Sequence, residues 1–262
     1  MDLELREAVV LLTGGSKGIG LACAKAFAAE GARVAIASRD PANLGTAASE
    51  LQKSGYSVMT LPVDLCDPQA AAQMVSDVES ALGPIRILVN CAGAARRTPP
   101  EELTAAHWHA AMDAKYFSYI HAMQAVLGPM AERGAGVIIN VIGTGGKVAS
   151  PTHIPGGAAN AALMLASTGL ANAFAGKGIR INSINPGLVV TDRLVEGFNA
   201  QSRMTGESFD ALMAAATAKA PMGRLAVPED IASVVVFLAS KQAGYVNGAL
   251  LTVDGAVSSV IL

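Results

Sequence analysis

The sequence contains few charged and few aromatic side chains. Of its 262 residues, 15% are charged and 4% are aromatic, whereas 52% are hydrophobic. With so little charge, much of the surface is expected to meet other protein rather than water, which indicates oligomerisation. The formal net charge is −2, and Lys and Arg are scattered rather than clustered. No basic field therefore favours a nucleic-acid partner.

Cysteine is scarce, and its spacing excludes the usual cysteine-based sites. Cys23, Cys66 and Cys91 have apolar neighbours and form no Cys-x-x-Cys pair. This pattern predicts buried thiols in a reducing compartment rather than a disulfide set. We expect no metal site.

Targeting and membrane signals are also missing from the sequence. The first residues, "MDLELREAVVLL", include acids and have neither a basic region nor a cleavage-like site. No apolar run is expected to reach the roughly 20 residues of a membrane span. We therefore expect a cytoplasmic, soluble protein that acts on a small molecule, with no membrane partner.

Short β-type runs alternate with alanine-rich helical segments along the chain. The runs lie at 8–13, 33–38, 57–63, 87–90, 136–141, 180–185 and 249–254. They are nearly continuous Val, Ile, Leu and Ala, as in strands that are buried on both faces. The alternation predicts one α/β domain over 1–262, a doubly wound Rossmann fold with a mostly parallel seven-stranded sheet. The segment 191–227 breaks the rhythm and is predicted to be a substrate lid.

A glycine-rich turn lies between the first predicted strand and the first predicted helix. In "TGGSKGIG", Gly14 permits a tight turn, Gly18 lets backbone approach a pyrophosphate, and Gly20 lets the helix pack on the strand. The N–H groups of the turn and the helix dipole then point at phosphate. The predicted cofactor contacts from this turn are Gly14, Ser16, Lys17, Gly18, Ile19 and Gly20.

The spacing Gly-x-x-x-Gly-x-Gly resembles that of the short-chain dehydrogenase/reductase family, and the resemblance covers essentially the whole chain. Similar segments are "PVDL" (62–65), "NCAG" (90–93) and "INPGLVVT" (184–191). The resemblance implies that the first lies against adenine, the second lines the crevice and the third holds the nicotinamide amide. It also implies a homodimer or homotetramer built through the fourth and fifth helices. The cofactor-binding residues it implies here are Asp64, Leu65, Asn90, Ala92, Gly93, Pro186, Gly187, Val189 and Thr191.

The end of the second predicted strand bears on which nicotinamide cofactor binds. A carboxylate there bonds the ribose 2′-hydroxyl of NAD(H) and repels a 2′-phosphate. The strand ends in Ser38 and Arg39 instead, and Lys17 is a second cation within reach. Two cations favour NADP(H) over NAD(H), because charge-assisted bonds to phosphate are strong. Asp40 weakens this argument, and the alternative is that both cations are solvated surface charges.

The catalytic groups of that family are absent from the aligned positions. The resemblance implies an asparagine, a serine and a Tyr-x-x-x-Lys pair, in which the tyrosine exchanges the proton and the lysine lowers its pKa. In the aligned register these four places hold Lys115, Gly143, Gly156 and Asn160. No tyrosine falls between 141 and 160. The chain is thus predicted to be an atypical member that lacks the Asn/Ser/Tyr/Lys set.

Four residues are candidates for the missing chemistry. Lys115 is predicted to act as an acid or to polarise a carbonyl, with its pKa lowered by desolvation; the alternative is a lysine that snorkels to solvent. His153 can exchange protons near neutral pH, although a lone loop histidine is more often structural. Thr144 takes the place of the serine after a shift of one residue, and Asn160 takes the place of the lysine.

Three functions remain open from the sequence. The leading hypothesis is an NADP(H)-dependent oxidoreductase that acts on a carbonyl, an alcohol or a polarised alkene with an unusual proton donor. The second is a catalytically inactive protein that binds or senses NADP(H). The third is a non-redox lyase or isomerase that uses the vacated crevice, because a fold does not fix a function.

Overall fold

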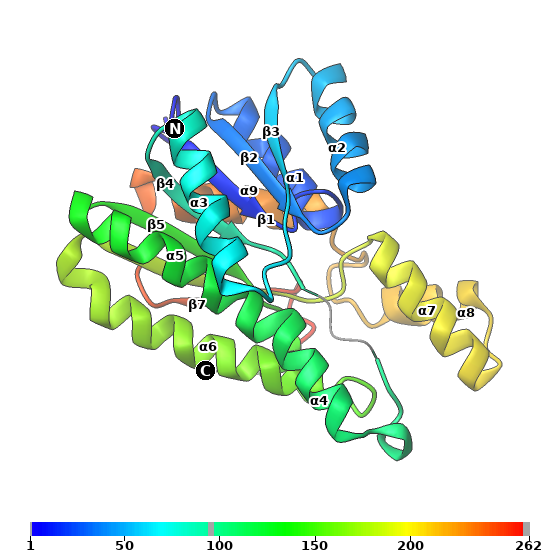
Figure 1. Cartoon of the computed structure of the whole chain (residues 1–262). Coiled ribbons are helices and arrows are strands. Elements are labelled where there is room, and N and C mark those ends of the chain that lie inside the picture. Colours follow the sequence, from blue (N-terminus) through cyan, green and yellow to red (C-terminus); the bar gives the residue numbers. More distant parts are fainter. Residues whose placement is uncertain (1, 94–96, 259–262) are drawn as a thin grey trace.

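A sheet of seven parallel strands runs through the part of the chain that the computed structural model describes, residues 2–93 and 97–258 (Figure 1). The order of its strands reverses between β1 and β4, which is where a doubly wound fold opens a ligand crevice. The prediction of a Rossmann-type α/β fold is confirmed, and every described strand pair is parallel. In spatial order the strands are β3 (Val58–Pro62), β2 (Arg33–Ser38), β1 (Val9–Thr13), β4 (Ile85–Asn90), β5 (Gly136–Val141), β6 (Ile179–Pro186) and β7 (Leu250–Val253).

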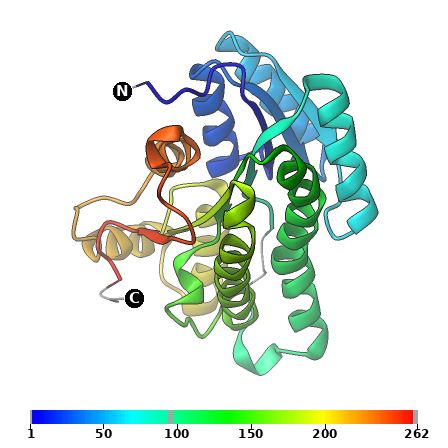
Figure 2. The same ribbon diagram turned by 90° about the vertical axis from the view of Figure 1, so that its left-hand side faces the viewer.

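Helices cover both faces of this sheet. Buried side chains of α1, α2 and α9 form one core with one face, and those of α3, α5 and α6 form a second core with the other. Figure 2 shows α9 (orange) and α5 (green) on opposite sides of the strands. The longer helices are α1 (Gly18–Ala29), α2 (Pro41–Lys53), α3 (Pro68–Leu82), α4 (Ala105–Ala111), α5 (Ser118–Arg133), α6 (Ile154–Phe174), α7 (Asp192–Thr205), α8 (Phe209–Ala218) and α9 (Pro228–Ala239). Shorter helical turns are η1 (Pro100–Glu102), η2 (Met112–Phe117), η3 (Thr144–Gly146), η4 (Ala175–Lys177) and η5 (Lys241–Ala243).

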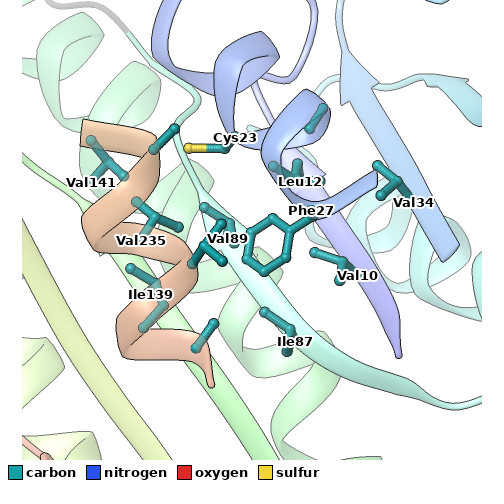
Figure 3. Packing of buried hydrophobic residues seen from close by; sticks show 14 of the residues in the cluster. Val10, Leu12, Cys23, Phe27, Val34, Ile87, Val89, Ile139, Val141 and Val235 are labelled. Carbon is teal, nitrogen blue, oxygen red and sulfur yellow. The ribbon is translucent and has the colours of Figure 1, made fainter. Parts of the chain in front are cut away.

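The continuous apolar strands explain why the central strands are buried on both sides, whereas the edge strands β3 and β7 are largely half-buried or exposed, contrary to the expectation for them. All five residues of β1 and all six of β5 are buried. Phe27 of α1 is fully buried and lies among side chains of the central strands in Figure 3, including Val10 and Ile87. Burial of one such side chain contributes roughly 1.5–3 kcal/mol.

The helix α6 corrects one expectation from the sequence. Together with the turn η4 it spans Ile154–Lys177, which is long and apolar enough, by length and composition alone, to cross a membrane, so the expectation that no apolar run reaches that length is wrong. Counting only uninterrupted apolar letters missed it, because alanine and leucine keep the mean hydropathy high across the polar residues between them. In this fold α6 packs on the second core through Leu163, Met164 and Ala171.

The cysteines only partly follow the expectation of burial. Cys23 is buried and Cys91 is half-buried, but Cys66 is exposed, so its predicted burial is wrong. Cys66 follows the end of β3 and donates a hydrogen bond to the Asp113 carbonyl at 3.5 Å. Within the described residues, no group of three or more His, Cys, Asp or Glu residues could hold a metal ion.

Candidate functional site

The glycine turn between β1 and α1 has the close contacts that only glycine permits. Gly14 has φ +67°, and a Cβ there would lie 2.7 Å from the Ala92 backbone nitrogen. A Cβ on Gly20 would lie 2.1 Å from the Gly14 carbonyl oxygen, so the first turn of α1 sits directly on the loop. Gly18 has φ +51° and faces Thr191. The turn, which follows β1, therefore contacts the segments that follow β4 and β6.

The first turn of α1 is open to an anion. Lys17 occupies the N-cap position and its side chain makes no capping hydrogen bond. The first N–H groups of a helix have no partner within the helix, so they and the helix dipole favour a phosphate at this position. The Lys17 side chain is exposed beside it.

The end of β2 is followed by one cation, Arg39, and by the acid Asp40, whose carboxylate is already bonded. The Ser16 hydroxyl donates to the Ser38 hydroxyl at 3.1 Å, and Arg39 is exposed. The Asp40 carboxylate caps α2, where it accepts from the backbone N–H of Ala42 at 2.8 Å. It also accepts from the side chain of Asn43 at 2.8 Å. The Asp40 carboxylate, which weakened the sequence argument for NADP(H), is thus used to cap the start of α2.

A cavity of about 850 Å³ opens where β4, β5 and β6 end. A second cavity, of about 360 Å³, adjoins it and shares several lining residues with it, including Lys115 and His153. The predicted residues that line the larger cavity are Ile19, Gly93, Lys115, His153, Pro186, Gly187, Val189 and Thr191. Thr144 and Asn160 line the smaller one. The predicted residues that line neither are Gly14, Ser16, Lys17, Gly18, Gly20, Ser38, Arg39, Asp64, Leu65, Asn90 and Ala92.

Lys115 lies in the π-helical turn η2 that joins α4 to α5. Such turns are frequent at functional sites, because the extra residue alters the direction of a side chain. Gly93, at φ +93°, packs against this turn, and a Cβ there would lie 2.1 Å from the Ala114 carbonyl oxygen. The loop after β4 and the π turn therefore touch backbone to backbone, which fixes Lys115 beside the predicted cofactor segment.

The Lys115 side chain is buried and bonded rather than directed to solvent. It is 7% exposed, and its Nζ donates to the Tyr119 hydroxyl at 2.7 Å and to the Val141 carbonyl at 3.0 Å. Burial, together with repulsion from Arg193, lowers the pKa of Lys115 from 10.5 to about 7. The snorkelling alternative is wrong. At neutral pH both forms of the amine are populated, so Lys115 is able to give or take a proton at the cavity wall.

Tyr119 supports Lys115 from inside the protein, and sequence reasoning missed it. Its ring is fully buried, and its hydroxyl donates to the Val141 carbonyl at 2.6 Å. The Lys115 Nζ lies 4.3 Å from the centre of the Tyr119 ring. Burial raises the pKa of Tyr119, so its hydroxyl stays neutral. The Lys-x-x-x-Tyr spacing, which sets two side chains on one helix face, was the available signal.

A row of buried polar side chains crosses the sheet, one residue before Cys91 and Val141, which line the larger cavity. The Thr13 hydroxyl donates to Asn90 at 3.1 Å, and the Asn90 amide donates to Asn140 at 2.9 Å. Asn140 in turn donates to the Ser167 hydroxyl of α6 at 2.9 Å. These bonds hold the ends of β1, β4 and β5 in register. Asn90, predicted to bind cofactor, is fully buried in this row, and its side chain is used there.

His153 immediately precedes α6 and lines both cavities. Its Nδ1 is buried without a hydrogen-bond partner among the described residues. Burial lowers the pKa of His153 to about 4, and the neighbouring charges of Arg97, Arg193 and Lys115 act in the same direction. The imidazole is therefore neutral at pH 7.

Glycines let the loop after β5 pack tightly on α6. A Cβ on Gly157 would lie 2.7 Å from the Gly145 carbonyl oxygen. Asn160 is buried, and its Nδ2 lies 3.5 Å from the Cβ positions that side chains at Gly143 and Gly145 would have. The amide of Asn160 is thus directed at the loop, next to Thr144 in the smaller cavity.

Three arginines that the sequence reasoning did not single out also line the larger cavity. Arg97 follows β4, whereas Arg193 and Arg203 belong to α7. The signal available was position alone: Arg193 follows Thr191 by two residues. In Figure 1, α7 and α8 (yellow) stand to one side of the sheet.

Helices α7 and α8 make up much of the predicted lid segment. Leu194, Ala220 and Leu225 form a small separate core there, against which Phe198 and Met213 pack. Phe198 also lines the larger cavity. The segment is therefore folded on itself and presents one side to the cavity.

Comparison with known proteins gives one consistent picture. The family model described as enoyl-(acyl carrier protein) reductase matches residues 14–258. The 2-(S)-hydroxypropyl-CoM dehydrogenase 3 of Xanthobacter autotrophicus is 32% identical over 260 residues, which cover 99% of this chain and 100% of that protein. The structure of L-sorbose reductase from Gluconobacter frateurii, complexed with NADPH and L-sorbose, matches with a TM-score of 0.91, 31% identity and full coverage of both chains. A 7α-hydroxysteroid dehydrogenase complexed with NADH and 7-oxoglycochenodeoxycholic acid matches with a TM-score of 0.88 and 27% identity, covering 97% of this chain and 96% of that one.

Proposed function

The chain belongs to the short-chain dehydrogenase/reductase family, and from that premise we propose that it is an NADP(H)-dependent oxidoreductase in which Lys115 exchanges the proton. Its relatives are oxidoreductases that act on alcohols and ketones. The substrate is a carbonyl compound, its alcohol or a polarised alkene. The observation that carries the proposal is the buried amine of Lys115 at the wall of the larger cavity.

The residues at the glycine turn fit a nicotinamide dinucleotide. A Cβ at Gly14 or Gly20 would strike neighbouring backbone, so the turn stays narrow, and the first turn of α1 is left uncapped by Lys17. Both features favour a pyrophosphate at the helix start. Pro186, Gly187, Leu188, Val189 and Thr191 line the larger cavity, where the nicotinamide is proposed to lie. When bound, the nicotinamide supplies or accepts the hydride.

The preference for NADP(H) is supported by charge at the end of β2. Arg39 is exposed there, Lys17 is exposed at the start of α1 beside Ser16, which bonds Ser38, and the Asp40 carboxylate is occupied in capping α2. Guanidinium and ammonium groups bind a 2′-phosphate strongly, whereas the Asp40 carboxylate is not left to bind a free 2′-hydroxyl. Solved relatives carry NADPH in three cases and NADH in one, so the relatives alone do not decide it.

Lys115 suits the proton-transfer role better than His153 does. Reduction of a carbonyl adds a hydride to carbon and a proton to oxygen. Lys115 has a pKa of about 7 and is half protonated at neutral pH, whereas His153, with a pKa of about 4, is neutral and has no acidic proton to give. Two N–H groups of the Lys115 ammonium are used by Tyr119 and Val141, which leaves one for the substrate oxygen.

The remaining candidates are proposed to bind the substrate rather than to transfer protons. Thr144 offers a hydroxyl and Asn160 an amide at the smaller cavity, and both can orient a carbonyl oxygen. Neither replaces the tyrosine and lysine of the family, and Gly156 stands where the tyrosine is expected. The chain is therefore proposed to be an atypical member that works without that set.

The segment 191–227 is proposed to cover the substrate. Helix α7 begins beside the glycine turn, because its N-cap residue Thr191 lies next to Gly18, and its residues form one wall of the larger cavity. A self-packed pair of helices attached at the nicotinamide end is able to exclude water when substrate is bound.

Association into a homodimer or homotetramer is proposed from exposed apolar side chains. Trp108 and Phe117 are 40% exposed, and Leu165 on α6 is 78% exposed. Such side chains on neighbouring helices are typical of an interface between subunits. Light scattering at several protein concentrations tests this association.

The function is tested by following NADPH consumption with a panel of ketones, aldehydes and enones. The wild-type protein is expected to oxidise NADPH with at least one class, and Lys115→Met to be slower by about 10²–10⁴-fold. Lys53→Met, an exposed change in the last turn of α2, is the matched control and should keep the wild-type rate. Binding of NADPH without any turnover would instead indicate a sensing or scaffolding protein.

A further inference from the structure

Basic side chains from three separate segments converge on the larger cavity. Arg97 comes from the loop after β4, Lys115 from the π turn, and Arg193 and Arg203 from α7. Glu102 and Glu196 are the carboxylates that line the same cavity, and Asp254 lines the smaller one. With Lys115 protonated, four positive charges face two negative ones in the larger cavity.

Hydrogen bonds to Thr152 hold both the Arg97 side chain and the backbone next to it. Its Nη1 donates to the Thr152 hydroxyl at 3.2 Å, and the backbone N–H of Thr98 donates to the Thr152 carbonyl at 3.0 Å. Its Nε lies 3.9 Å from the Cβ position of a side chain at Gly197, so the guanidinium group passes close to α7. The loop before α6 therefore fixes Arg97 against the lid helix.

Arg97 and Arg193 meet on one face of α7. Residues 193 and 197 are four apart on that helix and so share a face. The Arg193 Nη1 donates to the Gly93 carbonyl at 3.2 Å, which points its head at the end of β4. The positive charges of Arg97 and Arg193 repel each other, and both also lower the pKa of His153. An anion at this point relieves that repulsion.

We propose that the cavity selects carbonyl substrates that carry a carboxylate, with the carboxylate bound by Arg97 and Arg193 and the carbonyl oxygen at Lys115. The assignment rests on the proposed reductase function. Guanidinium groups bind carboxylates through parallel N–H bonds, which gives orientation as well as affinity. A substrate fixed at its charged end presents its carbonyl to the nicotinamide in one orientation.

His153 fits the same assignment. Its imidazole is neutral, its Nδ1 has no hydrogen-bond partner among the described residues, and it lies beside Arg97 and Arg193. A neutral imidazole offers one N–H donor to an anion. The side chain is therefore placed to complete the carboxylate site without adding charge.

The proposal is tested by binding, so that it does not depend on turnover. Protein saturated with NADP⁺ is titrated calorimetrically with 4-oxopentanoate and 6-oxoheptanoate, and with the methyl ester of each. The wild type is expected to bind the acids about tenfold more tightly than the esters, and the preference should shrink in about 0.5 M salt. Arg97→Gln and Arg193→Gln should each remove most of the preference. Arg33→Gln, the same change in charge at the opposite end of the sheet, should leave it intact.

The outcomes separate this inference from the proposed function. If the acids bind preferentially but NADPH is never consumed, the carboxylate site stands and the reductase proposal fails. If the esters bind as tightly as the acids, or neither binds, the carboxylate site is overturned, whether or not neutral ketones are reduced. If the two arginine variants weaken NADPH binding and leave the acid preference unchanged, the anion they recognise is the phosphate of the cofactor and the inference is also overturned.

Discussion

Replacing Lys115 by methionine should change the pH dependence of stability in a way that only a desolvated amine explains. The pKa of Lys115 is lowered from 10.5 to about 7 in the folded protein, mainly by burial. Between these two values the unfolded chain binds more protons than the folded chain, so the stability of the wild type rises with pH. Methionine has a similar length and carries no proton, so the variant lacks this contribution.

The size of the effect follows from the shift in pKa. Each pH unit between about 7 and 10.5 adds about 1.4 kcal/mol to the stability of the wild type. Between pH 6 and pH 9 the wild type should therefore gain about 2–3 kcal/mol relative to Lys115→Met. The substitution leaves no buried donor without a partner, because the Tyr119 hydroxyl still donates to the Val141 carbonyl. The variant should fold, and it should be the more stable protein at the acidic end.

Urea unfolding followed by circular dichroism, at one protein concentration and at both pH values, measures the four free energies of unfolding. The difference between wild type and variant removes the contributions of the titrating groups that do not interact with Lys115. Keeping the concentration constant removes the effect of subunit association. A difference that stays within about 0.5 kcal/mol across this pH range would refute the desolvated amine, since that size is expected for unrelated surface effects.

Two further predictions concern the cofactor end. Arg39→Gln should weaken NADPH binding by about tenfold and leave NADH binding unchanged, as measured by cofactor fluorescence. Arg33→Gln, at the start of β2, is the control. An equal loss of affinity for both cofactors would contradict the contact between Arg39 and the 2′-phosphate. Gly20→Ala should abolish folding or cofactor binding, because its Cβ would lie 2.1 Å from the Gly14 carbonyl oxygen. Gly45→Ala is the control: its Cβ would have no neighbour within 4 Å, so the change should stabilise α2 by up to about 1 kcal/mol in a thermal melt. A Gly20→Ala variant that folds and binds NADPH normally would show that the turn can accommodate a Cβ at this position.

The fold was predictable because each strand carries its own signal. Runs such as 33–38 and 136–141 are apolar on both faces and match β2 and β5 residue for residue. The glycine turn could be recognised because Gly14 and Gly20 have no alternative to glycine at those contacts. Such local constraints are written in the sequence itself.

The environment of Lys115 could not be predicted, because it depends on contacts between distant segments. Its burial comes from Tyr119 on the same helix and from Val141 at the end of β5. Its π turn depends on the approach of Gly93, and no periodicity in the sequence encodes that. The sequence left open whether the amine faced solvent or the crevice, and only packing decided it.

The arginines of the cavity were missed for the same reason. Arg97 and Arg193 are 96 positions apart in the chain numbering and meet only because α7 folds back on the loop after β4. Asn90 gives the opposite case: its segment matched a cofactor-lining motif, yet its side chain is used in the buried row with Thr13 and Asn140.

The most direct test of the central claim is the pH profile of kcat/KM for carbonyl reduction with saturating NADPH. If Lys115 gives the proton, the profile of the wild type should fall above about pH 7, and alcohol oxidation should rise through the same value. Lys115→Met should be slow and flat across that range. A wild-type profile that stays level to pH 9, or an inflection near pH 7 that survives in Lys115→Met, would contradict the assignment.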